Sequence, residues 1–475
     1  MDVTTLSQEA QIEHFREMRA SVADDPFRPI YHFSPPGYGL HDVAGLCWWQ
    51  GKYHLFYLIT VPAVQWGRGH AVSYDLVHWR DLPMLPKEIW GGTGQAWADK
   101  DRVFLTTGSV NIASDPMLLN WTEHYRGRFG DNCVWREGDY YYLTMRGSKN
   151  TSLEIRRSKD LTEWESMGTY FEDSYFTDPG TDCACPNVVP IGNGKHLVLF
   201  FSHNRGPQYY IGTSNVEQGR FTIEKHGRMN YGQVMRGSLH SPSAFVDPKG
   251  RCIGMWNIFE CLIKEDFCGT EKEVVSLPRQ LSLNNISLNP LCIEPIEELK
   301  TLRFNPVKVE DVVIPANGEK ILPGVQGRAM ELEVVINPEQ AREVGLRVLR
   351  SPDGKEQTSI SLSMHAWALR HPNNRALMID VSQASLSSEV ASRTPEIGPL
   401  YLKDDEPLRL RVFIDRSIIE VFANGRQCLT LRAYPTRQDS TGVSVFARGN
   451  DAKLVSLRAY QMRSIWPEMK VKEGK

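Results

Sequence analysis

A spaced repeat in the first two-thirds of the chain most constrains its fold. The segments Ser73–Trp79, Ser114–Trp121 and Ser158–Trp164 each place an aspartate one or two positions after a serine and end on tryptophan, roughly 40 residues apart. Around them, short runs rich in Tyr, Phe, Val and Leu alternate with Gly, Asp, Asn and Pro, which indicates short β-strands joined by turns. Repeats of this period with about four strands each are typical of a β-propeller. We expect the repeated residues to pack and hydrogen-bond turns rather than to bind a ligand.

The length of 475 residues predicts two domains after an N-terminal extension. Residues 1–27 are expected to be a helical extension, because apolar side chains recur at roughly helical intervals and Thr5 with Gln8 fits a capping box. Residues 28–300 have room for five or six of the repeated units. Residues 301–306 are expected to be a linker.

Strand patterning resumes in the remaining chain, residues 307–475. In residues 408–414, Leu408, Leu410, Val412 and Ile414 alternate with Arg409, Arg411 and Phe413. Asn424-Gly425 is a hairpin turn signal. An antiparallel β-sandwich is the expected fold of this part. The whole chain is therefore predicted to be all-β.

Composition narrows the classes of partner. A net charge of -3, with 41% apolar and 23% charged residues, indicates neither a nucleic-acid nor a membrane partner. The charged N-terminus lacks the apolar core of a signal peptide, and no apolar run approaches the roughly 18 residues of a membrane span. Nine cysteines without framework spacing favour reduced thiols and a cytoplasmic location.

No cofactor or metal is expected. The chain has no phosphate loop, dinucleotide fingerprint or cluster at metal-ligand spacing. Cys183 and Cys185 are separated by one residue and have no second Cys or His pair at zinc spacing nearby, so buried free thiols are the preferred interpretation. The oligomeric state is left open by the sequence.

Two regions carry a resemblance to a known family. Residues 28–83 begin RPIYHFSPPGYGLHDVAGLCWWQGKYHLFY and end WGRGHAVSYDLVHWRDLP, and the tail contains Asp415-Arg416-Ser417 and the run EVFAN from Glu420. Both resemble glycoside hydrolase family 32, the invertases, inulinases and levanases. The resemblance spans nearly all of the chain after residue 27, and it implies five blades in the propeller. Asp415 and Glu420 are expected to be structural.

On this resemblance Asp42 is the catalytic nucleophile. The family writes Asn-Asp-Pro-Asn-Gly at this site, and residues 41–45 read His-Asp-Val-Ala-Gly. Burying a carboxylate without partners costs free energy, which favours a functional role for Asp42. The alternative is a turn-capping aspartate before Gly45.

The resemblance also implies that Asp131 holds sugar hydroxyls and stabilises an oxocarbenium-like transition state. Residues 130–132 read Gly-Asp-Asn where the family has Arg-Asp-Pro. Loss of the arginine removes a charged donor to sugar hydroxyls and is expected to change which furanoside fits. The alternative is an ordinary loop aspartate.

The third motif departs most from the family. Residues 184–186 read Ala-Cys-Pro in place of Glu-Cys-Pro, so alanine stands where the resemblance places the general acid. Asp182 lies two residues earlier, and in an extended strand such residues share a face roughly 6.5–7 Å apart. Three possibilities follow: Asp182 is the acid, another carboxyl such as Asp178 or Glu260 is the acid, or the site has none.

The residues around these carboxyls also differ from those of the family. Leu58 replaces a family glutamine, and two further motifs correspond to residues 92–95 and 240–243. His41 and His240 are expected to form hydrogen bonds. Trp66 and Trp97 are expected either to stack on a sugar ring or to pack within the protein. The expected substrate-binding residues are His41, Trp66, Gln95, Trp97 and His240.

Two functions from different classes remain. The first is a glycoside hydrolase or transglycosylase that acts on a fructoside-like or other furanosidic bond by a retaining mechanism, with a small carbohydrate as substrate and an altered general acid. The second is a catalytically silent carbohydrate-binding protein on the same scaffold, which Ala184 favours. In a variant of the first function, the protein is still an enzyme, and the substrate or a water molecule takes the place of the acidic side chain. The fold alone does not decide between them.

Overall fold

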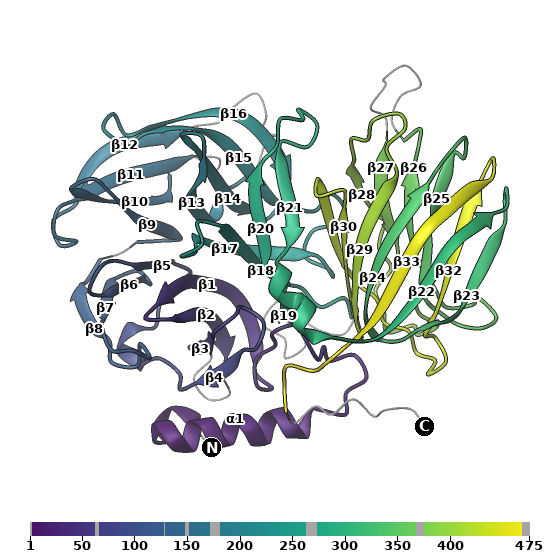
Figure 1. Ribbon diagram of the computed structural model, residues 1–475. Coiled ribbons are helices and arrows are strands. Elements are labelled where there is room, and N and C mark those ends of the chain that lie inside the picture. Colours follow the sequence, from purple (N-terminus) through teal and green to yellow (C-terminus); the bar gives the residue numbers. More distant parts are fainter. Residues whose placement is uncertain are drawn as a thin grey trace.

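A computed structural model describes residues 2–61, 66–127, 129–147, 152–171, 181–262, 273–366 and 375–467. Most of the regular structure in these residues is β-strand, which confirms the predicted all-β class (Figure 1). No helix within these ranges is long and apolar enough to cross a membrane.

Five antiparallel sheets follow one another along the first part of the chain. The first contains β1 (Gly39–Trp49), β2 (Lys52–Thr60), β3 (Gly67–Ser73) and β4 (Arg80–Leu82). After η2 (Lys87–Ile89), the second contains β5 (Ala96–Ala98), β6 (Val103–Thr106), β7 (Val110–Ala113) and β8 (Thr122–Tyr125). The third contains β9 (Asn132–Glu137), β10 (Tyr140–Arg146), β11 (Leu153–Ser158) and β12 (Glu165–Phe171).

The fourth sheet contains β13 (Ala184–Gly192), β14 (Lys195–Ser202), β15 (Gly206–Asn215) and β16 (Arg220–Arg228). The fifth contains β17 (Leu239–Val246), β18 (Cys252–Ile258), β20 (Arg279–Leu283) and β21 (Leu291–Pro295), with β19 (Val274–Val275) paired to β18. The short helix η3 (Glu297–Leu302) follows.

The repeated aspartates organise the turn between the third and fourth strands of the first three sheets. Asp75, Asp115 and Asp160 each accept hydrogen bonds from at least two backbone N–H groups of the turn that follows. The leucine of each repeat has a positive φ, 65° at Leu76 and 69° at Leu161. Left-handed backbone is unfavourable for leucine, so the aspartate bonds stabilise a strained turn. The structural interpretation of the repeat is confirmed.

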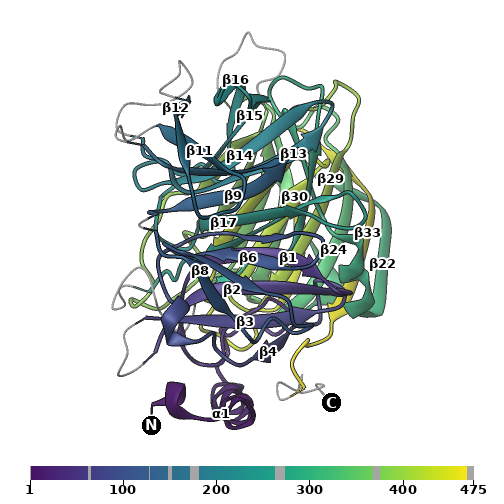
Figure 2. The ribbon, with the colours of Figure 1, turned by 90° about the vertical axis from the view of Figure 1, so that its left-hand side faces the viewer.

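The first strands of the five sheets form a closed ring. β1 contacts β5 and β17, β9 contacts β5 and β13, and β13 contacts β17. Figure 1 shows the sheets arranged around these strands, and Figure 2 shows the same sheets from the side, in front of the six-stranded sheets. Residues at the starting ends of the first strands therefore meet although they are far apart in sequence.

Three of the five first strands carry a β-bulge close to their start. The register shifts place residues 41–42 opposite one residue of β2, residues 185–186 opposite one of β14, and residues 240–241 opposite one of β18. A bulge bends the strand and redirects a side chain that regular alternation would point elsewhere. The bulges thus occur where the predicted site residues lie.

The rest of the chain forms two six-stranded sheets. One contains, in spatial order, β22 (Arg303–Ile314), β33 (Ala452–Met462), β24 (Ala329–Asn337), β29 (Leu408–Asp415), β30 (Ile418–Ala423) and β31 (Gln427–Arg432). The other contains β23 (Glu319–Gln326), β32 (Gly442–Arg448), β25 (Glu343–Arg350), β26 (Thr358–Ser363), β27 (Ala376–Asp380) and β28 (Glu396–Pro399). Apolar residues of both sheets share one buried core. Residues 301–306, the predicted linker, contain the end of η3 and the start of β22.

The N-terminal segment forms the predicted helix with a different cap. After η1 (Val3–Thr5), α1 (Gln8–Ser21) begins at Ser7, whose hydroxyl accepts a hydrogen bond from the Ala10 N–H at 3.3 Å. The predicted capping box of Thr5 and Gln8 is wrong, because the Thr5 hydroxyl donates to the Asp2 carbonyl instead. Thr5 ends a short helical turn, so extended Ser7 is the residue in position to cap.

A buried ionic network joins the five-sheet part to the six-stranded part. His32 contacts Asp415 through Nδ1 at 2.9 Å and Glu420 through Nε2 at 3.2 Å. Arg279 contributes a 2.7 Å ion pair to Glu420, and the backbone N–H groups of residues 30–32 donate to Asp415. Asp415 and Glu420 therefore have the structural role expected for them.

Candidate active site

Asp42 lies in the bulge of β1 and is largely buried, with 15% of its side chain exposed. One carboxylate oxygen accepts a hydrogen bond from the Thr93 hydroxyl, and the other lies 3.2 Å from Nδ1 of His240. Burial raises the pKa of Asp42, and the Thr93 hydrogen bond opposes this rise. Buried Arg68 lies near enough for its charge to favour the ionised carboxylate as well.

His240 contacts Asp42 but carries no positive charge that would balance the carboxylate. Burial lowers the pKa of His240 to about 3, so the imidazole is neutral at physiological pH. Its Nδ1 forms no hydrogen bond, because the 3.2 Å approach to Asp42 does not have hydrogen-bond direction. Asp42 is therefore a buried carboxyl with few partners.

Asp131 lies immediately before β9 and meets the fourth sheet. Its Oδ2 accepts a hydrogen bond from the Cys185 N–H at 3.1 Å. Cys185 has a φ of 50° within the bulge of β13, which directs this N–H toward Asp131. Burial, and then the charge of Asp42, raise the pKa of Asp131. Two of the predicted catalytic carboxyls are thus brought into one electrostatic environment.

Asp182 lies just before β13 and is held by a histidine from the turn after β14. Its two oxygens accept hydrogen bonds from the His203 backbone N–H at 2.7 Å and from His203 Nδ1 at 2.6 Å, and Arg146 Nη2 lies 3.8 Å away. Burial raises the pKa of Asp182, but the His203 hydrogen bonds outweigh burial and the pKa is lowered. An ionised Asp182 is suited to holding a protonated histidine and unsuited to donating a proton itself.

The alternative acids differ in their surroundings. Glu260 is buried against the six-stranded part, where it accepts hydrogen bonds from Tyr434 and from the Cys261 N–H. Asp178 lies outside the described residues. Ala184 is 2% exposed and pairs with Phe201 in the ladder of β13 and β14.

His41 and Trp66 lie together beside Asp42. Their ring centroids are 4.2 Å apart, and His41 Nε2 lies 2.7 Å from the Thr60 hydroxyl. Trp66 is 48% exposed, so it presents an aromatic surface next to the carboxyls. This surface is suited to packing against the apolar face of a sugar ring.

Gln95 and Trp97 lie differently from what the sequence predicts for a sugar contact. The Gln95 amide is buried and bonds Asn187 and Ser243, so it ties the second, fourth and fifth sheets together. Its donors and acceptors are used within the protein. Trp97 lines a cavity at the other ends of the first strands.

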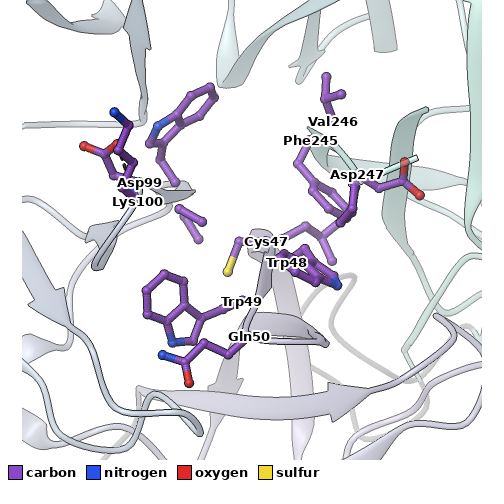
Figure 3. Close-up of a pocket in the computed structure, with 14 residues that line it drawn as sticks. Cys47, Trp48, Trp49, Gln50, Asp99, Lys100, Phe245, Val246 and Asp247 are labelled. Carbon is purple, nitrogen blue, oxygen red and sulfur yellow. Dashed lines mark hydrogen bonds between the residues drawn. The ribbon is translucent and has the colours of Figure 1, made fainter. Parts of the chain in front are cut away.

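That cavity has a volume of about 550 Å³, and its lining residues are drawn in Figure 3. Asp42, Asp131 and Asp182 are not among them. Its wall includes Trp48, Trp49 and Phe245, which belong to the far ends of β1 and β17. Asp42 and His240 belong to the starting ends of the same strands. This cavity therefore lies at the opposite ends of β1 and β17 from Asp42 and His240.

Several neighbours of Asp42 were not predicted from the sequence. Thr93 belongs to a motif position that the resemblance marked as altered, which was a usable signal. Arg68 and His203 had no such signal. Glu273 was also missed: it is fully buried, and burial raises its pKa well above the usual value, with Asn257 Nδ2 3.5 Å from Oε2.

Two further observations concern metals and thiols. In the described ranges, no group of three or more His, Cys, Asp or Glu side chains is arranged to hold a metal ion. Cys183 and Cys185 are buried free thiols, and burial raises the pKa of each well above its usual value. Cys185 remains a neutral thiol beside Asp42 and Asp131.

Comparisons with known proteins identify the family. Residues 32–131 and 95–295 match the glycosyl hydrolases family 32 N-terminal domain, and residues 298–461 match the family 32 C-terminal domain. A levanase of Bacillus subtilis (strain 168) is 25% identical over 94% of this chain and 72% of its own length. An insoluble isoenzyme of β-fructofuranosidase from Arabidopsis thaliana is 24% identical over 94% of this chain and 92% of its own length.

Solved structures share the fold. Fructan 1-exohydrolase IIa from Cichorium intybus superposes with a TM-score of 0.79 at 20% identity, covering 93% of this chain and 98% of that one. Sucrose-6-phosphate hydrolase from Lactobacillus gasseri gives a TM-score of 0.77 at 20% identity, covering 95% and 96%. The matched domains span nearly all of the chain after residue 31, and the resemblance found in the sequence is confirmed. The chain belongs to glycosyl hydrolase family 32, and its enzyme class is that of the glycosidases, which act on O-glycosyl bonds.

Proposed function

We propose that this protein hydrolyses or transfers the glycosyl group of a fructoside-like or other furanosidic substrate, with retention at the anomeric carbon. The observation that carries the proposal is the meeting of Asp42 and Asp131 at the starting ends of the first strands, where the charge of one raises the pKa of the other. A pure binding protein has less need of two poorly paired carboxyls. The relatives named levanase and β-fructofuranosidase support a fructoside as substrate.

In this proposal Asp42 attacks the anomeric carbon and forms a glycosyl ester, while the departing oxygen takes a proton from an acid. A water, or an acceptor hydroxyl in transfer, then attacks the ester, loses its proton to the conjugate base and releases Asp42. Asp131 accepts hydrogen bonds from sugar hydroxyls and stabilises the positive charge that develops on the ring. His41 and Trp66 line the sugar, and His240 packs beside the nucleophile.

The altered acid is assigned to the fourth sheet. Position 184 has no acidic group, and Asp182 is the nearest carboxyl along the strand. Because Asp182 is hydrogen-bonded to His203, we place the proton-donating function in this pair.

The scaffold is proposed to be a five-bladed β-propeller followed by a β-sandwich. The ring of five first strands supports the blades, and the shared core of the two six-stranded sheets supports the sandwich. The boundaries proposed are 1–27, 28–300, 301–306 and 307–475.

The test replaces Asp42 by asparagine and measures hydrolysis of aryl furanosides, whose good leaving group needs little acid assistance. Asp42→Asn is expected to lower kcat on the order of 10³-fold or more, since an amide cannot form the ester. Asp160→Asn is the matched control, because it makes the same change in a turn distant from the site. A variant that keeps more than about a tenth of wild-type activity would remove Asp42 from the nucleophile's role.

The second candidate, a silent carbohydrate-binding protein, is favoured by the alanine at position 184. Titration calorimetry with fructosides and other furanosides distinguishes it from the first. Sugar binding by wild type without any turnover of aryl or alkyl furanosides would establish the second candidate.

A further inference from the structure

The unexplained feature of the proposed site is its proton donor. Asp182 is kept ionised by its hydrogen bonds, and Glu260 is buried and accepts hydrogen bonds from Tyr434 and the Cys261 N–H. Glu273 has no exposed surface with which to reach a substrate. Burial lowers the pKa values of His41 and His240, so neither ring carries a proton to donate at neutral pH.

Among the residues that the structure describes, His203 is a further titratable side chain close to these carboxyls. It lies in the turn between β14 and β15, directly after β14. Ala184 pairs with Phe201 across the ladder, so Asp182 and His203 each lie two residues beyond this pair, at the same end of the sheet. Its side chain is 51% exposed, in contrast to the 9% exposure of Asp182.

The ring of His203 has a defined orientation. Its backbone N–H and its Nδ1 both bond Asp182, at 2.7 and 2.6 Å. Since the carboxylate accepts from Nδ1–H, the other nitrogen, Nε2, points away from Asp182. No hydrogen bond to Nε2 is found among the residues that the structure describes, and the side chain is half exposed, so Nε2 is available to a bound molecule.

His203 is also close to the reacting groups. The ring of Phe201 lies 5.4 Å from that of His203 and 4.3 Å from that of His240, and His240 in turn contacts Asp42. The charge of His203 lowers the pKa values of Asp42 and Asp131, although burial is the larger effect on both.

We propose that His203, oriented by Asp182, is the general acid of this enzyme and replaces the missing carboxyl at position 184. The proposal rests on the proposed function. As Asp42 bonds to the anomeric carbon, the glycosidic C–O bond breaks and Nε2–H gives its proton to the departing oxygen. The neutral ring then accepts a proton from the water or acceptor hydroxyl that attacks the ester. Asp182 is a positioning residue that keeps its charge throughout.

The charges around His203 favour its protonated form. The Asp182 hydrogen bond raises the pKa of His203, burial opposes the rise, and the charge of Asp131 adds to it. Arg146 acts in the opposite direction, and the neutral His240 adds no charge. A raised pKa keeps the ring protonated to a higher pH than an ordinary histidine, and activity that requires the protonated form is lost as pH rises through this pKa.

The experiment compares 4-nitrophenyl and methyl furanosides of the sugar that wild type cleaves. His203→Gln is expected to lower kcat/KM on the methyl furanoside about 10²–10⁴-fold and to change that on the nitrophenyl furanoside far less, because nitrophenolate leaves without a proton. The alkaline limb of the pH profile on the methyl furanoside is expected to disappear. His124→Gln, an exposed histidine of the second sheet, is the matched control.

Asp182→Asn provides the second measurement. Loss of the carboxylate removes the main cause of the raised pKa of His203, so the alkaline limb is expected to move to lower pH while the nitrophenyl furanoside is still cleaved. This readout separates a proton donor from a residue needed only for folding. If His203→Gln does not fold, the position of the alkaline limb in the pH profile of Asp182→Asn still tests the assignment of His203 as the acid.

Equal losses on both substrates in folded His203→Gln, or an unmoved alkaline limb in Asp182→Asn, would overturn the assignment while leaving the proposed function intact. Failure of the proposed function is recognised separately. It would appear as wild type without turnover of either furanoside, or as full activity in Asp42→Asn, and either result also removes the basis for His203 as acid.

Discussion

Two clusters of buried acidic groups and histidines differ in how completely they are paired. At the junction of the two parts, Glu420 has Arg279, His32 and a backbone N–H as partners, and the Arg279 charge with these bonds lowers its pKa against the effect of burial. At the starting ends of the first strands, burial dominates and the pKa values of Asp42 and Asp131 are raised. Removing one partner of a buried ion pair is costly because it leaves the other charge uncompensated, whereas a poorly paired carboxylate is free to react with a substrate.

The sharpest test of this comparison removes one carboxylate from each cluster. Glu420→Gln is expected to lower the free energy of unfolding by about 3–5 kcal/mol, because it leaves buried Arg279 without its partner. Asp42→Asn is expected to leave stability unchanged or raised, since it removes a poorly compensated buried charge. Urea unfolding followed by fluorescence measures both. Glu310→Gln, which breaks an exposed ion pair with Lys308, serves as control. Equal losses in both clusters would break the comparison.

Enzymatic activity, unlike stability, should depend on the carboxyls at the starting ends of the first strands. Asp131→Asn is expected to lower kcat about 10²–10³-fold, because one charged contact to the transition state is lost. The amide oxygen can still accept from Cys185, so the thermal unfolding midpoint should not fall. Steady-state kinetics on an aryl furanoside and a melting curve on the same sample are the measurements. A parallel loss of activity and stability would assign Asp131 to the scaffold.

Restoring the family's acid sharpens the comparison further. Ala184→Glu adds a carboxyl where the resemblance places one. In a His203→Gln background it is expected to recover hydrolysis of alkyl furanosides by about 10²-fold, provided the new side chain reaches the departing oxygen. Ala184→Gln is the isosteric control. A folded double variant that binds sugar without any recovery would contradict the alignment of position 184.

Substrate preference follows from the rewritten residues. Gly130 and Leu58 remove donors that the resemblance places against sugar hydroxyls, so sucrose, inulin and levan are expected to be poor substrates. Turnover of each can be measured by release of reducing sugar. Hydrolysis with kcat on the order of 10–100 per second would show that these positions matter less than proposed.

The smallest expected effect is a pH dependence of stability at the paired cluster. Burial lowers the pKa of His32, but hydrogen bonds to Asp415 and Glu420 outweigh it, and the pKa in the folded state is raised. A raised pKa contributes stability that is present below the unfolded value of about 6.5 and is lost as pH rises through the folded value. Urea midpoints should therefore decline with rising pH in wild type. His32→Gln should flatten this decline, and an unchanged slope would contradict the assignment.

Much of this protein could be predicted from local pattern. The Ser, Asp and Trp repeat predicted sheet turns, and the structure has aspartate-bonded turns at Asp75, Asp115 and Asp160. Strand alternation predicted the all-β class, and the motif around Asp42 predicted the family. These features depend on neighbours within a few residues, or on short runs that resemble the motifs of a family, and so can be recognised without coordinates.

The all-β class, the repeated turns and the family follow from the sequence, whereas the partners of each carboxyl follow from the way in which the chain folds. His203 is 21 residues from Asp182, yet ladder pairing in one hairpin brings them into contact. Thr93 precedes the second sheet and His240 lies in the first strand of the fifth, and both reach Asp42 because the first strands close into a ring. Arg68 comes from β3 of the same sheet as Asp42. A pKa depends on burial and on charges within a few ångströms, and chain separation does not specify those distances. For that reason the sequence could mark Asp42, Asp131 and Asp182 as candidates, while the assignment of the proton to His203 required the folded chain.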